Sequence, residues 1–133
     1  MYHRIKLNSS CKTEFIDITA SIKQLLSASG VTDGLACIFV PHTTAAVTIN
    51  ENADPDVTAD IDRFLTVNID NQCKYHHSEG NSPAHIKASL LGSSEMVMID
   101  GGELLLGTWQ GIYFCEFDGP RQRTYFVKFI QEN

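Results

Sequence analysis

The 133-residue sequence lacks the features of several large protein classes. It has no apolar run long enough to cross a membrane, and its first segment lacks the apolar core of a signal peptide, so we expect a cytoplasmic protein with no membrane partner. Its four cysteines form no C-x-x-C pair, which favours free thiols over a disulfide framework. The formal net charge of −6 leaves no basic excess and disfavours a nucleic-acid partner.

The sequence also lacks the common signatures of nucleotide-binding proteins and hydrolases. It contains no Walker loop, no dinucleotide-binding glycine fingerprint and no nucleophile elbow. No repeat of fixed period and no linker divide it. The length suffices to bury a core without disulfides, so we expect a single domain spanning residues 1–133.

The apolar pattern that is present predicts both strands and helices. Strands are predicted at residues 2–7, 35–40, 42–52, 96–99, 103–106, 112–117 and 124–130. Helices are predicted from a cap at Asp17 or Thr19 to Ser29, and from Asp54 to about Thr66. A third is predicted to follow Ser82 and to end at Gly92. These elements indicate an α+β domain with a largely antiparallel sheet or sandwich of about seven short strands and three helices.

The third helix begins next to a concentration of histidines, at residues 75–92. Ser82 is predicted as its N-cap and Pro83 as its first residue, because proline's missing N–H is unpaired at a helix start anyway. His76 and His77 precede it and His85 falls in its first turn. Its apolar positions predict a buried stripe of Ile86, Leu90 and Leu91.

These histidines allow two interpretations, which the residues alone weigh about evenly. A helix start favours an anion, and imidazoles can hold a metal or move protons. Three histidines without zinc-finger spacing can equally be exposed side chains on a surface turn.

Three further groups of polar residues stand out along the sequence. Glu51, where a predicted strand leads to a helix, could be a general base, a magnesium ligand or a cap partner. Trp109 is bracketed by glycines and fits a core aromatic beside a bulge, whereas the polar Gln110 beside it is harder to explain structurally. Arg121 and Arg123, two residues apart on a predicted strand, could clamp phosphate or form surface ion pairs.

Three blocks of this sequence together resemble one family. They are HTTAAVTINEN from His42, YHHSEGNSPAHIKASLLG from Tyr75 and LLLGTWQGIYFCEFDGPR from Leu104. This combination is similar to the YjbQ-like family, often labelled secondary thiamine-phosphate synthase. The resemblance implies an α+β fold of YjbQ type, a homotrimer and polar motif residues near subunit boundaries. It also implies a divalent metal, zinc or magnesium, on His42, His77 and His85.

The activity implied by the resemblance joins hydroxymethylpyrimidine diphosphate to thiazole phosphate with loss of pyrophosphate. Carried onto this sequence, it makes Glu51, His85, Trp109 and Gln110 the candidate catalytic residues. The candidate ligands of a small phosphorylated metabolite are Asn81, Ser82, Arg121 and Arg123. The chain has no D-D-x-x-D-like magnesium cluster, so the alternative is a non-catalytic trimeric module that binds a metabolite or anion around a structural metal.

Overall fold

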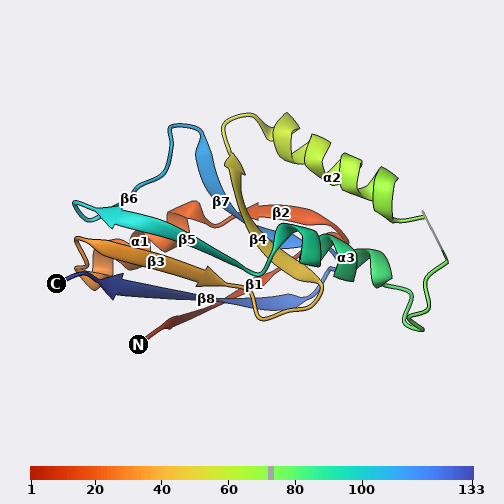
Figure 1. Ribbon diagram of the computed structural model, residues 1–133, viewed down its shortest axis with the longest axis horizontal. Coiled ribbons are helices and arrows are strands. Elements are labelled where there is room, and N and C mark those ends of the chain that lie inside the picture. Colours follow the sequence, from red (N-terminus) through yellow and green to blue (C-terminus); the bar gives the residue numbers. More distant parts are fainter. Residues whose placement is uncertain (72–73) are drawn as a thin grey trace.

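The computed structural model describes residues 1–71 and 74–133, which form two antiparallel sheets and three helices (Figure 1). The helices are α1 (Thr19–Ser29), α2 (Pro55–Ile69) and α3 (Ser82–Leu91). The strands are β1 (His3–Asn8), β2 (Glu14–Asp17), β3 (Gly34–Phe39), β4 (Ala45–Glu51), β5 (Ser94–Asp100), β6 (Glu103–Leu104), β7 (Gln110–Glu116) and β8 (Gln122–Gln131). The α+β class and the antiparallel pairing are confirmed, with β2 as a strand beyond those predicted.

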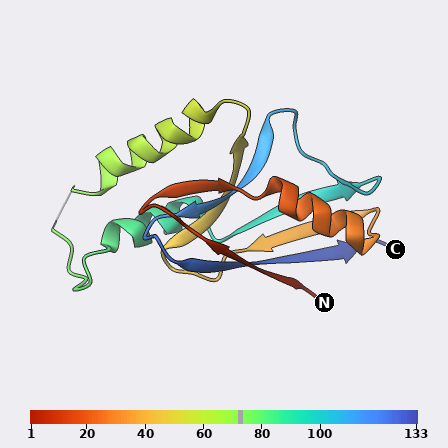
Figure 2. The ribbon, with the colours of Figure 1, turned by 180° about the vertical axis from the view of Figure 1, so that it is seen from behind.

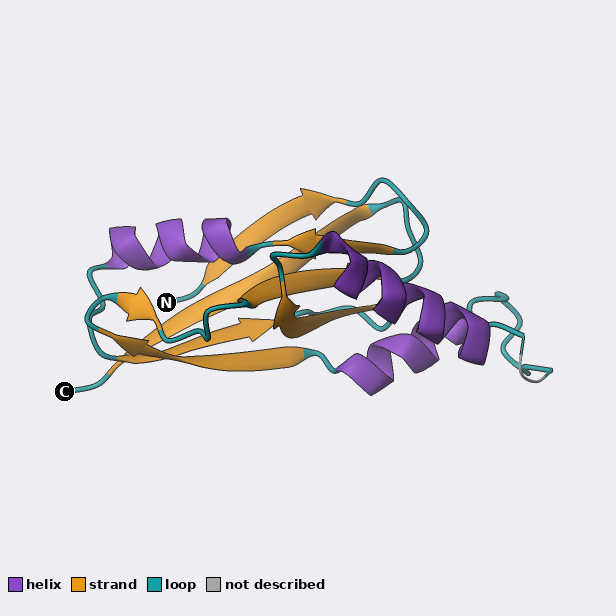
Figure 3. Ribbon diagram, turned by 90° about the horizontal axis from the view of Figure 1, so that it is seen from above, coloured by secondary structure: helices purple, strands orange, loops and turns teal. Residues whose placement is uncertain are grey.

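The two sheets differ in size and are covered differently. The larger sheet has the order β1-β8-β3-β5-β6, and the smaller has the order β2-β7-β4. Helix α1 runs along one end of the two sheets, and α2 and α3 lie on the other side of the small sheet (Figures 2 and 3). None of the helices in the described ranges is long and apolar enough to cross a bilayer.

Two apolar cores follow from this layering. The first lies between the sheets and under α1, with Ile22, Ile38 and Phe114 fully buried in it. The second lies between the small sheet and the helices α2 and α3, and contains Leu65 and Phe117. Strand β7 is buried on both faces because it contributes alternate residues to each core, which explains its continuous apolar sequence.

One helix start and one hairpin turn form where the sequence predicts them. The Asp54 side chain caps α2 by accepting a hydrogen bond from the backbone N–H of Asp56 at 2.9 Å, and the helix runs on to Ile69, beyond its predicted end. The β5–β6 hairpin turns at Gly101 and Gly102, whose φ angles of 59° and 80° explain why both are glycine.

Helix α3 departs from the prediction in its cap and in its buried face. Its N-cap is Asn81 rather than Ser82, and no side-chain hydrogen bond caps the helix; the Asn81 amide nitrogen donates to Asp118. The predicted stripe is wrong at Leu90, which is 66% exposed, whereas Lys87 is 2% exposed. Small alanines at 84 and 88 bring this face of the helix close to β4, and the Lys87 stem follows them inward.

The outer face of the large sheet is apolar and carries no covering element among the described residues. Phe39, Met96, Met98 and Ile130 project from it and are between 46% and 61% exposed. They lie side by side because the strand registers pair neighbouring residues across β5, β3 and β8. Such a contiguous apolar face is unusual for a surface that meets only water.

Candidate functional site

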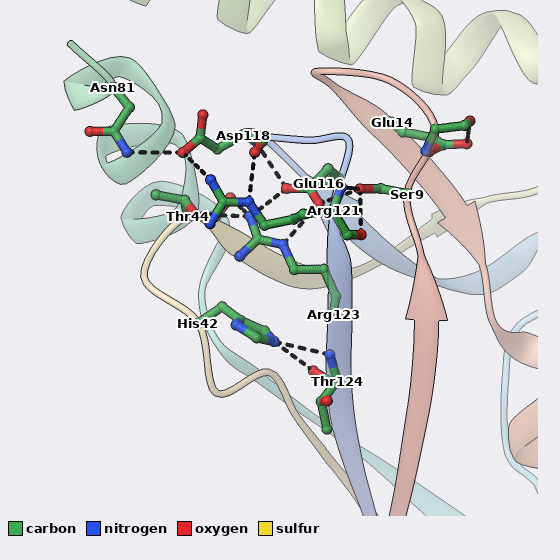
Figure 4. Close-up of polar contacts among 11 residues, drawn as sticks. Ser9, Glu14, His42, Thr44, Asn81, Glu116, Asp118, Arg121, Arg123 and Thr124 are labelled. Carbon is green, nitrogen blue, oxygen red and sulfur yellow. Dashed lines mark hydrogen bonds and ion pairs between the residues drawn. The ribbon is translucent and has the colours of Figure 1, made fainter. Parts of the chain in front are cut away.

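His42 takes its position from the way β3 ends. The β3–β8 register pairs Phe39 with Phe126, so its continuation would place Pro41 opposite Thr124. Pro41 has no N–H and cannot continue the ladder. The His42 ring lies there instead, with Nε2 3.0 Å from the backbone nitrogen of Thr124 and 3.1 Å from its carbonyl oxygen (Figure 4).

His42 is neutral near pH 7, although the hydrogen bond with Thr124 by itself raises its pKa, and one ring nitrogen remains available. Burial lowers the pKa of His42, and the positive charge of Arg123 lowers it further. Nε2 either accepts the Thr124 N–H or donates to the Thr124 carbonyl, according to the tautomer. When Nε2 carries the hydrogen, Nδ1 is free to accept a proton or a ligand; in the other tautomer Nδ1 carries the hydrogen and can only donate it.

A pocket of about 460 Å³ lies between the β3–β4 connection and α3, and both His42 and His85 line it. Thr43, Ser89 and Ser93 also line this space, and the Ser89 hydroxyl donates to the His85 carbonyl at 2.9 Å. Two imidazoles at one open pocket can act as proton acceptor and proton donor to the same small molecule. We call this space the histidine pocket.

His77 approaches His85 from the loop before α3. The two rings are nearly perpendicular, with centroids 5.2 Å apart. Two imidazoles that share a tetrahedral metal at ~2.0–2.1 Å have centroids roughly 5 Å apart, and this is also a normal distance for an edge-to-face ring contact. Within residues 1–71 and 74–133, no three His, Cys, Asp or Glu side chains are grouped to hold a metal. Of the three predicted ligands, therefore, only His77 and His85 are placed as a pair that could share a metal ion, and His42 is not grouped with them as a third ligand.

Arg123 lies behind the histidine pocket and is buried with Glu116. The guanidinium donates to both carboxylate oxygens, at 2.8 and 2.5 Å, and to the Thr44 hydroxyl at 2.8 Å. Ser9 donates a further hydrogen bond to Glu116 at 2.6 Å. Burial alone would raise the pKa of Glu116, but the hydrogen bonds from Arg123, Ser9 and the backbone N–H of Asp118, with the Arg123 charge, lower it overall.

Arg121 is the accessible arginine of the predicted pair. Its side chain is 50% exposed and donates to the carbonyl and the carboxylate of Asp118, each at 2.9 Å. Asn81 donates to the same carboxylate at 2.9 Å (Figure 4). Asp118 thus links Asn81, and with it the half-buried Ser82, to Arg121, whereas Arg123 supports the group from inside.

The remaining predicted catalytic residues lie at the opposite end of β4. His42 precedes this strand and Glu51 ends it, so the two ends are about 20 Å apart at ~3.3 Å per residue. Glu51 pairs with Gln110 on β7, and the Gln110 side chain accepts a hydrogen bond from the backbone of Gly107 at 2.8 Å. Trp109 lies in the loop between β6 and β7. Its side chain is 62% exposed, so it is not a core aromatic. The predicted catalytic set is therefore split between two places in one chain.

The whole sequence matches one family profile. The profile described as UPF0047 protein YjbQ-like covers residues 3–132. The chain belongs to the YjbQ family. Its relatives in this family include the UPF0047 protein MJ1081 of Methanocaldococcus jannaschii, which is 52% identical over 98% of this chain and 94% of the relative. The UPF0047 protein YugU of Bacillus subtilis is 48% identical over 98% of this chain and 99% of the relative.

Solved structures of the YjbQ family have the same fold. An uncharacterised YjbQ/UPF0047 protein from Clostridium acetobutylicum superposes with a TM-score of 0.94 at 57% identity, over 96% of this chain and 99% of that one. A protein of unknown function from Sulfolobus solfataricus gives a TM-score of 0.94 at 31% identity, over 99% and 97% of the two chains. These similarities place the chain in a family and a fold, and none of these relatives is named for an activity.

In this YjbQ-family chain, several residues that build the site were missed by sequence reasoning. Glu116 had a signal, because it is a carboxylate inside an otherwise apolar run. Asp118 stands in an Asp-Gly-Pro stretch, which signals a turn but no further role. Thr44 and Thr124 had no signal, since they act through tertiary contacts with Arg123 and His42 that only the fold creates.

Proposed function

We propose that the protein is an enzyme that acts on a small phosphorylated metabolite in the histidine pocket. The observation that carries the proposal is that His42 and His85 line one open pocket, with the half-exposed guanidinium of Arg121 outside its lining. Arg121 is near enough to His42 to lower the pKa of that histidine, behind the larger effects of burial and Arg123. A phosphate is the group that such a combination of guanidinium and imidazoles recognises best.

The division of roles follows from the environment of each side chain. His42 is held neutral by its lowered pKa, so it can accept a proton near pH 7. His85, on the facing helix, is the partner that returns a proton to the leaving group. Arg121 and Asn81, both tied to Asp118, hold the phosphate with Ser82, whereas Arg123 keeps the Thr44 segment and therefore the pocket wall in place.

A divalent metal, zinc or magnesium, is part of this proposal. Its support is the His77–His85 pair, whose nitrogen donors suit zinc better than magnesium. When bound, such an ion supplies Lewis-acid stabilisation of negative charge. The reaction we propose to assay is the one implied by the family resemblance, formation of thiamine phosphate with loss of pyrophosphate. In it, the thiazole nitrogen, which carries no proton, bonds to the pyrimidine methylene carbon as the carbon–oxygen bond to pyrophosphate breaks. Arg121 would neutralise the leaving pyrophosphate. His42 would take a proton from the pyrimidine amino group as pyrophosphate leaves and return it once the new bond has formed.

We also propose that the protein works as a homotrimer in the cytoplasm. The uncovered apolar face of the large sheet supports self-association, because its side chains would otherwise face water. A second copy is also the way in which Glu51, Trp109 and Gln110 could reach a histidine pocket, since about 20 Å separates them from it within a chain. The free thiol of the buried Cys115 suits a reducing compartment.

The association is tested by light scattering on the eluting protein. A Met96→Asp variant should elute as a monomer, because it places a charge in the apolar face. Leu90→Asp is the matched control, since Leu90 is similarly exposed but lies on α3. A wild-type protein that is monomeric at ~100 times the working concentration would remove the trimer from the proposal.

The second candidate function is non-catalytic binding of a phosphorylated metabolite. The specific observation in its favour is the hydrogen bonding of both arginines to carboxylates, which builds a fixed cradle without an activated nucleophile among the described residues. Under this alternative the metabolite binds and is released unchanged.

The deciding experiment is thiamine phosphate formation with and without added zinc or magnesium. His85→Ala should lower turnover by about 100-fold, the lower end of what a positioned acid or base contributes. His76→Ala is the matched control, because this exposed histidine precedes His77 and belongs to no proposed set. Turnover that is absent in the wild type, or equal in His85→Ala, would refute the enzyme and leave the binding function to be tested by calorimetry.

A further inference from the structure

A second, smaller polar cavity lies between the end of α2 and the start of α3, apart from the histidine pocket. Its volume is about 130 Å³, which at ~30 Å³ per water is room for about four water-sized groups. Asp70, Asn81, Lys87 and Asp118 line it on the inner side, and Lys12 and Glu79 line it at the exposed edge. We call it the α2–α3 cavity.

The buried ammonium of Lys87 is the unusual feature of this cavity. Lysine is almost never fully buried without a partner. Here Nζ lies 2.7 Å from the Asp70 carboxylate, 3.5 Å from the Thr66 hydroxyl and 5.9 Å from the centre of the Phe117 ring. An ammonium has three N–H donors, and these contacts engage two of them, one weakly. The group can therefore donate to an oxygen in the cavity.

An unpartnered acceptor lies in the same cavity. The Asn81 amide nitrogen is bonded to Asp118, but its oxygen Oδ1 is buried and has no hydrogen-bond partner among the described residues. A buried acceptor without a partner costs ~1–3 kcal/mol, so it calls for a donor from whatever occupies the space. The occupant must thus accept from Lys87 and donate to Asn81.

The charges that remain after internal pairing have both signs. Lys87 is paired with Asp70, and Asp118 with Arg121. Lys12 and Glu79 have no ion pair within the described part of the chain, and both border the cavity. One spare cation and one spare anion match a small molecule that carries one carboxylate and one ammonium.

We infer that the α2–α3 cavity binds a small zwitterionic amino acid. Its carboxylate accepts hydrogen bonds from Lys87 and faces Lys12, and its ammonium donates to Asn81 Oδ1 and faces Glu79. The volume limits the side chain to a hydrogen, a methyl or a hydroxymethyl group. Since Asn81 also holds Asp118, the occupant adjoins the hydrogen-bonded group that positions Arg121.

The inference is tested by calorimetric titration of the full-length protein with glycine. Glycolate and methylamine are the comparison probes, because each keeps one charge of glycine and lacks the other. Glycine should bind at least tenfold more tightly than either probe. Glu79→Gln and Lys12→Gln should each weaken glycine about tenfold, as the loss of a hydrogen bond to a charged group does. Glu103→Gln and Lys128→Gln, exposed residues elsewhere, should leave its affinity unchanged.

Lys87→Met tests the buried partner directly and should abolish binding. If that variant fails to fold by circular dichroism, Asn81→Leu replaces it, because it removes the oxygen that accepts from the ligand ammonium and should also weaken glycine. Absence of heat with glycine at ~10 mM, or equal affinity for glycolate, would show that the cavity holds water or a simple anion and would overturn the inference. The readout is binding, so neither result depends on the proposed enzyme activity.

Discussion

Replacing Arg123 by methionine should be among the most destabilising single changes in this chain. Arg123 and Glu116 are 3% and 0% exposed, so the substitution leaves a buried carboxylate without its counter-charge. Breaking a buried ion pair in this way costs ~3–5 kcal/mol, and the Thr44 hydroxyl also loses its donor. A domain of this size has a total stability of ~5–15 kcal/mol, so the variant should be close to its folding limit.

The double variant Arg123→Met/Glu116→Leu distinguishes the loss of charge balance from the loss of packing. With both charges removed, stability should recover by ~2 kcal/mol or more over Arg123→Met alone, although Ser9 loses its acceptor. Urea unfolding monitored by circular dichroism measures each variant. Arg121→Met is the control, because its half-exposed pair with Asp118 should cost no more than ~1 kcal/mol. The reasoning fails if Arg123→Met costs less than Arg121→Met, or if the double variant is no more stable than the single one.

Three further predictions concern strand pairing, pH and assembly. Gly34→Ala should lower the free energy of unfolding in urea by about 3 kcal/mol or more, because the added Cβ would lie 1.8 Å from the Ile130 carbonyl oxygen. Gly80→Ala places its Cβ in open space and should cost only ~1–2 kcal/mol. Equal costs for the two variants would contradict this reasoning. His42 and Glu116 both have lowered pKa values, so each contributes stability that is fully present above its ordinary pKa, 6.5 or 4.5, and is lost as the pH falls. The free energy of unfolding should therefore decline from pH 7 to pH 4, and should decline less steeply in Glu116→Gln. Parallel pH curves for the two proteins would contradict this prediction. In the proposed trimer, Glu51 of one copy would reach the histidine pocket of another copy. Refolded mixtures of His85→Ala and Glu51→Gln should then recover activity that neither variant has alone. If no activity is recovered, the two ends of β4 do not form a shared site.

The arrangement of elements could be predicted from the sequence because local signals agreed with it. Asp54 before Pro55 marks a helix start, and the adjacent Gly101 and Gly102 mark a hairpin, through backbone chemistry that acts within a few residues. A sandwich of two sheets was one of the two forms predicted, but the strand order within the sheets was not, since it depends on contacts between distant segments.

The candidate site was predicted as residue types but not as an arrangement. The histidines and arginines could be singled out because, in this sequence, they are concentrated next to a predicted helix start and a turn. Their geometry could not be predicted, because alternation on a strand suggested that Arg121 and Arg123 share a face. Arg121 instead precedes β8 and turns back to Asp118, while Arg123 enters the interior toward Glu116.

The burial of Lys87 shows why the apolar stripe of α3 was mispredicted. Hydrophobicity alone selects Leu90 over Lys87 for the core. The fold selects the face with Ala84 and Ala88, because only small residues let the helix approach β4 closely, and Asp70 at the end of α2 supplies the counter-charge for the lysine. Because the helix turns the Ala84 and Ala88 face inward, Leu90 lies on the exposed side.

His42 offers a way to separate folding from chemistry at one position. Its ring replaces the backbone partner that Pro41 cannot provide to Thr124. A glutamine amide carries both a donor and an acceptor, so His42→Gln can satisfy Thr124 and should change the unfolding free energy by less than ~1 kcal/mol. His42→Phe leaves the part-buried Thr124 N–H and carbonyl without this partner and should cost ~1–3 kcal/mol.

Both variants lack a titrating ring nitrogen, so both should lose turnover by about 100-fold whatever their stability. The measurement pairs urea unfolding with the thiamine phosphate assay on the same preparations. Equal destabilisation of the two variants would show that the ring is held by packing rather than by Thr124. Full activity in His42→Gln would show that position 42 serves the fold alone, and that proton transfer in the pocket rests on His85.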